Sequence, residues 1–126
     1  MAFWVFMLLC ELLCPAAMVL FGHGFMTHPP KKVNHVYGYR TGRSMKNQET
    51  WEFAHIHCGK LWRRIGLWML PLTVLAHLFL LGKSMDAAGI GAGVIVALQI
   101  AVMVSSVVPT ERALKRAFDE QGNRRT

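Results

Sequence analysis

The chain contains one compact group of side chains of the kinds that bind metal ions, at Glu52, His55, His57 and Cys58. Glu52 and His55 are three residues apart, so on a helix they would share a face, an arrangement that carboxylate metal sites use. His57 would point away from that face, and the sequence has no second copy of the motif. We therefore expect neither a metal site nor a cofactor.

Motifs of hydrolases, metalloproteases and nucleotide-binding proteins are missing from the 126 residues. The sequence has no HExxH, no GxSxG and no glycine-rich loop that would hold phosphates. Ser44 or Cys58 could serve as a nucleophile only beside a base that a third group orients, and no such pair is recognisable. We expect that the protein is not an enzyme.

A second set of polar side chains lies within strongly apolar stretches: Glu11, Thr73, His77 and Gln99. A charged side chain at the bilayer centre costs roughly 2.5–3.5 kcal/mol, so Glu11 should face a partner or be protonated. Thr73 and His77 are one helical turn apart on one face. The rise of a helix puts Glu11 and His77 within hydrogen-bonding reach, directly or through water, and we predict a polar cluster of the four. The cluster would either link helices or form a proton-sensitive or ligand-contacting site.

Three apolar runs carry these residues, at about 2–22, 65–82 and 87–108. Each fits the roughly 20 residues that a helix needs to cross a bilayer, and none shows the polar face of a soluble helix. The sequence therefore predicts an all-α integral membrane bundle of three transmembrane helices, in a single domain over 1–126. A signal peptide is the alternative for the first run, but Glu11 interrupts it and no basic residue precedes it.

Basic residues gather in two segments, eight in 23–64 and five in 109–126, whereas the connection around 82–86 has only Lys83. The positive-inside rule then predicts a bacterial inner-membrane protein with its N-terminus outside. The segment 23–64 would be a cytoplasmic cap and 109–126 a cytoplasmic tail. Topology accounts for the net charge of +7. Attraction to anionic lipid headgroups follows from it, and direct nucleic-acid binding is not expected.

The segment 23–64 divides into an irregular first part and a helix. Asn47 is a good N-cap residue. From Trp51 to Ile65, apolar residues recur every three or four positions, which predicts an amphipathic helix lying on the inner membrane surface before the second span. The part before it is aromatic and β-branched, so we expect an ordered loop rather than disorder. Four aromatic residues suit the headgroup level: Tyr37, Tyr39, Trp51 and Trp62.

The third run has small residues at every fourth position: Gly89, Gly93, Ala97, Ala101 and Ser105. Such a ridge lets another backbone approach closely. We expect the ridge to pack within the chain, for example against the first span. A second copy of the protein is the alternative, which leaves a homo-oligomer open.

The stretch NHVYGYRTGRSMKNQETWEFAHIHCGK, residues 34–60, resembles the signature of the SdpI family of bacterial membrane proteins. The matching positions are Asn34, Gly38, Tyr39, Arg40, Thr41, Ser44, Asn47, Trp51, Ala54 and Gly59. The family's named member gives immunity to a secreted peptide toxin and also signals by holding a transcriptional repressor at the membrane. That member is longer, with additional membrane helices, so this chain resembles a short three-span form.

The resemblance implies a multi-pass membrane protein that confers immunity to a secreted, membrane-active peptide toxin. In the cap, Arg40 would clamp an anion or headgroup, or the cap would only anchor the protein at the membrane surface. Two other functions stay open: a small transporter or channel component that uses Glu11 and His77, and an anchor that sequesters a soluble regulator. The expected partners are membrane lipids together with a peptide toxin or a soluble repressor.

Overall fold

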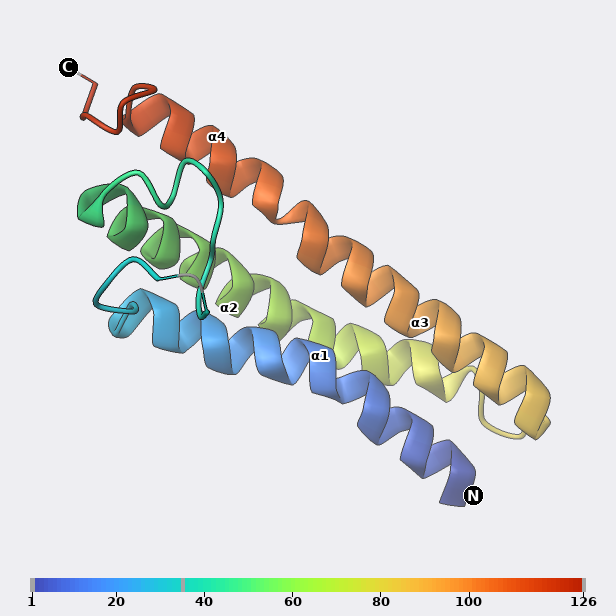
Figure 1. The fold of residues 1–126 in the computed structure, drawn as a ribbon. Coiled ribbons are helices and arrows are strands. Elements are labelled where there is room, and N and C mark those ends of the chain that lie inside the picture. The colour runs from blue at the N-terminus through green and yellow to red at the C-terminus, as the bar shows by residue number, and fades with distance from the viewer. Residues whose placement is uncertain (1, 35, 126) are drawn as a thin grey trace.

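The structure, a computed structural model, describes residues 2–34 and 36–125. Within these ranges the chain forms four helices: α1 (Ala2–Thr27), α2 (Gln48–Leu78), α3 (Met85–Ser105) and α4 (Val107–Ala117). α1 and α2 lie side by side, and α3 continues almost in line into α4, which ends beside the start of α2 (Figure 1). The described part of the chain has no strand, and the predicted all-α class is confirmed.

Two helical segments are long and apolar enough to cross a membrane: Ala2–Thr27 and the run Met85–Ala117 that α3 and α4 form. The first continues past its predicted end at residue 22, and the second contains the predicted run 87–108. The run predicted at 65–82 is not a helix of its own. Only residues 65–78 of α2 follow Arg64, which is less than the roughly 20 residues of a full span.

α2 is one continuous helix of 31 residues, and not a separate surface helix that turns into a span. Its buried residues follow steps of three and four along most of its length: Trp51, Ala54, Cys58, Gly66, Met69, Thr73 and His77. The amphipathic stripe and the later apolar run therefore share one face, and both halves pack inward without a break. Asn47 caps the helix as predicted, because its Oδ1 accepts the N–H of Thr50 at 2.9 Å.

α1 and α2 bring their backbones into close contact at Gly22 and Gly59. A Cβ atom on Gly22 would lie 2.7 Å from the Gly59 carbonyl oxygen, and one on Gly59 would lie 2.5 Å from the Gly22 carbonyl oxygen. The buried residues of α1 alternate in steps of four and three: Glu11, Pro15, Met18, Gly22 and Phe25. This is the spacing of helices that pack with their axes nearly aligned and with small residues where they touch; here the two helices run in opposite directions (Figure 1).

The small-residue ridge of α3 makes no comparable contact. Four of its members are exposed: Gly93, Ala97, Ala101 and Ser105. A Cβ atom on Gly93 would have nothing within 4 Å. The buried positions of α3 are instead Ala88, Ala92 and Gln99. The expectation that the ridge packs within the chain is therefore wrong, because α3 turns a different row of residues inward.

Candidate functional site

Residues 28–34 and 36–47, which we call the cap loop, fold over the end of α1 and the start of α2 and reach α4 (Figure 1). A buried cluster holds the loop in place: Tyr39, Ala54, Cys58, Leu114 and Phe118. Trp51 is fully buried, and its Nε1 donates to the Pro30 carbonyl oxygen at 2.7 Å. Trp51 and Tyr39 are buried within the protein, whereas Tyr37 is 49% exposed. Their position at headgroup level stays a prediction.

His55 is the buried centre on which the cap loop folds. Its Nδ1 lies 2.8 Å from the Trp51 carbonyl oxygen, and its Nε2 lies 2.8 Å from the backbone nitrogen of Tyr39. A carbonyl only accepts and an N–H only donates, so Nδ1 carries the proton, Nε2 accepts, and the ring is neutral. Burial lowers the pKa of His55, against the opposing effect of the bond to Trp51.

Gly38 allows the loop to pass directly over this ring. Its φ angle is +113°, a conformation that L side chains rarely adopt. A Cβ atom at this position would lie 2.4 Å from His55 Nε2 and 3.3 Å from Trp51 Cη2. Two physical features therefore require glycine at this position of the signature: the positive φ angle and the ring packed against the backbone.

Tyr39 joins the cap loop to α4. Its hydroxyl donates to Glu111 Oε1 at 2.7 Å, and Glu111 Oε2 lies 3.8 Å from Arg43 Nε. Burial, followed by the bond to Glu111, raises the pKa of Tyr39 well above its usual range, so the phenol stays a donor. Glu111 was not among the predicted site residues, because it is 72 positions away from Tyr39 in sequence.

The remaining polar residues of the signature mostly satisfy backbone groups of the cap loop. Asn34 Oδ1 accepts the N–H groups of Val36 and Tyr37 at 2.9 and 2.7 Å. The fully buried Ser44 accepts the N–H of Thr41 at 2.9 Å and donates to a carbonyl oxygen of the loop. Asn47 also donates to the Gly122 carbonyl oxygen at 2.8 Å. Arg40 lies on the exposed side of the loop.

The predicted cluster of Glu11, Thr73, His77 and Gln99 is present as two pairs. Glu11 Oε2 and His77 Nδ1 lie 2.6 Å apart, and both side chains are fully buried. The second pair links α3 to α2, since Gln99 Nε2 donates to Thr73 Oγ1 at 2.8 Å. A groove of about 260 Å³ between α2 and α3 runs along this second pair. The contact predicted between Glu11 and His77 is therefore present.

The Glu11–His77 pair holds one proton between its two facing atoms. His77 Nε2 lies 2.8 Å from the Trp4 carbonyl oxygen, which only accepts, so Nε2 is protonated. The proton between Nδ1 and Oε2 lies either on Nδ1, which gives an ion pair, or on Oε2, which gives two neutral groups. In both forms the pair is neutral overall, as a membrane interior requires.

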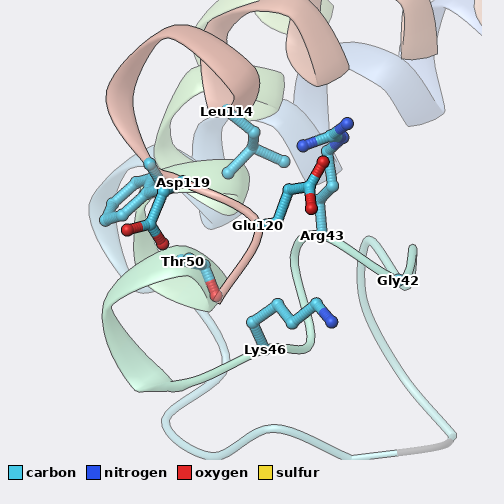
Figure 2. Close-up of a pocket in the computed structure, with 8 residues that line it drawn as sticks. Gly42, Arg43, Lys46, Thr50, Leu114, Asp119 and Glu120 are labelled. Atoms are coloured by element: carbon cyan, nitrogen blue, oxygen red, sulfur yellow. The ribbon is translucent and has the colours of Figure 1, made fainter. Parts of the chain in front are cut away.

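A charged cavity of about 360 Å³ opens between the cap loop and the segment after α4. Figure 2 shows Arg43 and Lys46 of the loop, with Glu120 lying between Arg43 and Asp119 in this view. Asp119 already accepts two backbone N–H groups, at 3.0 and 2.9 Å. The sequence did not reveal this cavity, because residues 118–125 show only as part of a basic tail.

The group Glu52, His55, His57 and Cys58 does not assemble as a site. Within residues 2–34 and 36–125, no three His, Cys, Asp or Glu side chains are grouped so that they could hold a metal ion. Both ring nitrogens of His55 already have partners. Burial raises the pKa of Cys58 to about 12, so its thiol stays protonated and is a poor nucleophile.

These features define an all-helical membrane protein with a polar segment folded into a cap at one end. The model of the SdpI/YfhL protein family matches residues 31–110. The uncharacterized protein YfhL of Bacillus subtilis (strain 168) is 32% identical over 111 residues, which cover 86% of this chain and 89% of the relative. The chain belongs to the SdpI/YfhL family. No solved structure matches it.

Proposed function

We propose that this chain is a three-span protein of the bacterial cytoplasmic membrane that confers immunity to a secreted, membrane-active peptide toxin. Membership of the SdpI/YfhL family supports the proposal. In this topology the residues 65–82 complete a short middle span between α1 and α3. The N-terminus lies outside, and the cap loop and α4 lie inside, where the positive-inside rule puts basic segments.

The observation that carries the proposal is the division of the signature into buried and displayed side chains. Tyr39, Ser44 and Trp51 are buried and hold the shape of the cap loop. Arg40 is exposed on the same loop as Val36, which is 88% exposed. A loop that displays both a guanidinium and an exposed apolar side chain suits contact with an amphipathic peptide in the membrane interface. In this proposal the cap engages the inserted toxin and Arg40 clamps an anionic group on it.

The test is survival of a toxin-sensitive Gram-positive strain that is challenged with the secreted peptide. Cells with the wild-type chain should survive, and cells with Arg40→Ala at the same membrane level should not. Lys31→Ala removes another exposed cation of the loop and should still protect. If the well-inserted wild type gives no protection, immunity to that toxin is excluded. If Arg40→Ala protects fully, the clamp is wrong.

A second candidate, a small proton-linked transporter, is favoured by the buried Glu11–His77 pair. The pair places two titratable side chains in contact inside an apolar segment, and a proton pathway needs such groups to take up and release a proton. Purified protein in liposomes under a pH gradient would carry protons, and Glu11→Gln would stop the flux while keeping a polar partner for His77. Wild-type liposomes that are no leakier than empty ones would exclude this candidate.

A further inference from the structure

A basic cavity of about 300 Å³ lies where the C-terminal part of α1 packs on the middle of α2. Its lining consists of Met26, Lys60, Arg63, Arg64 and Leu67. All three basic residues are exposed, so their charges are accessible to a ligand. No acidic residue of the described chain lines this cavity. In the charged cavity of the cap, by contrast, Arg43 and Lys46 face Asp119 and Glu120.

The lining changes from charged to apolar along one side of α2. Lys60 and Arg64 are one helical turn apart and share a face. Leu67, 50% exposed, follows one turn after Arg64, and the adjacent Trp68 is 68% exposed. An exposed tryptophan one turn from arginine is the arrangement of a membrane–water interface. The cavity therefore lies at headgroup level, with its basic end toward water and its apolar end toward the hydrocarbon.

The two helices hold these side chains in a fixed arrangement. The close Gly22–Gly59 contact lies beside the cavity, and a Cβ atom on Gly22 would be 2.6 Å from the backbone nitrogen of Arg63. Arg63 Nη1 also lies 3.9 Å from Met26 Sδ of α1. The pKa of a nearby histidine also indicates a positive potential in this part of α2. The pKa of His57 is lowered by burial and then by the charge of Lys60.

We infer that this cavity binds the phosphate group of an anionic phospholipid of the inner leaflet. Lys60, Arg63 and Arg64 would surround the phosphodiester, and an acyl chain would run along Leu67. Basic pockets between membrane helices on the cytoplasmic side have this chemistry. The inference does not depend on toxin immunity, but its choice of the inner leaflet rests on the topology proposed above.

The test measures binding of phosphatidylglycerol to the purified full-length chain in a nonionic detergent, by native mass spectrometry and by thermal stabilisation. Lys60→Gln combined with Arg64→Gln removes two charges from the cavity. Each basic residue near an anionic surface contributes to the free energy of lipid binding. The loss of both should weaken binding about 30-fold. Lys31→Gln combined with Lys32→Gln removes the same charge from the exposed loop and should bind as the wild type does. Far-UV circular dichroism confirms that both double variants remain helical.

Two further ligands separate the sources of phosphate. Phosphatidylcholine has the same acyl chains without net charge and should bind weakly to every variant. Inorganic phosphate at the same concentration should neither stabilise the protein nor displace the lipid. The inference is overturned if the cavity variant binds like the wild type, or if the loop variant loses as much. It is also overturned if inorganic phosphate competes on equal terms, since the cavity would then be a general anion site.

Discussion

Gly38→Ala should open the cap loop without disturbing the rest of the fold. An alanine at φ +113° is strained, and its Cβ would lie 2.4 Å from His55 Nε2. Relief of that contact requires the loop to move away from the ring. The Tyr39 N–H would then lose its bond to His55, which is 2.8 Å long and buried.

The size of the effect follows from these two contributions. Left-handed backbone costs an L residue roughly 1–2 kcal/mol, and a buried donor left without a partner costs about 1–3 kcal/mol. A total near 3 kcal/mol would raise the fraction of open cap loops about 100-fold, since each 1.4 kcal/mol is a factor of ten. The opening should stay local, because the backbone contact between α1 and α2 at Gly22 and Gly59 does not involve the loop.

Cys58 provides the assay, because its side chain is only 1% exposed beneath the cap loop. In a Cys10→Ala, Cys14→Ala background, the rate of thiol alkylation at pH 8 reports the opening of the cap alone. The rate should rise about 100-fold in Gly38→Ala, in proportion to the open fraction. Burial keeps the pKa of this thiol at about 12 in the closed form, so labelling of closed molecules contributes little.

Gly42→Ala is the matched control. Gly42 lies in the same loop, has no positive φ, and a Cβ atom there would have nothing within 4 Å. Its alkylation rate should equal that of the parent. If Gly38→Ala also labels at the parental rate, or if Gly42→Ala accelerates labelling as much, the account of Gly38 and His55 is refuted.

Two further predictions concern stability in detergent. Because burial lowers the folded-state pKa of His55, stability should be complete above pH 6.5 and decline as the pH falls, when only the unfolded ring gains a proton. Stability should therefore be lower at pH 5.5 than at pH 7.5, and the decline should be smaller for His55→Gln. Equal pH profiles of thermal unfolding for the two proteins would contradict this. Gly59→Ala should lower the melting temperature, because its Cβ would separate α1 from α2 at a cost of about 1–3 kcal/mol. Gly24→Ala is the control and should leave the melting temperature unchanged, because a Cβ atom there would meet nothing within 4 Å. Equal melting temperatures for the two variants would show that the close contact is unimportant.

Features that depend on local spacing could be predicted from the sequence. The start of α2 at Asn47 follows from its capping side chain, and the buried stripe of α2 follows from steps of three and four. The contact between Glu11 and His77 was predictable because a charged residue in an apolar run needs a partner at its own depth. The continuity of α2 was missed because spacing alone does not say whether an amphipathic segment and an apolar one share an axis.

Features that depend on distant contacts could not be predicted. Nothing near Tyr39 in the sequence indicates that Glu111 accepts a hydrogen bond from its hydroxyl, or that Phe118 packs in the same buried cluster. The ridge at Gly93 and Ala97 was misjudged for a related reason. A helix that is apolar all round has several rows that could face inward, and in α3 the neighbours selected the row with Gln99.

The bond between Asn47 and Gly122 joins residues 75 positions apart, and this has a consequence for biogenesis. A ribosome adding about 5–20 residues per second needs roughly 4–15 s to make the intervening chain. Until then the cap loop is without α4. α4 reaches the loop only when α3 runs back along α2, as in Figure 1. Closure of the cap therefore requires that α3 and α4 have been made and have packed back along α2, and chains in which they have not would keep this loop open to proteases.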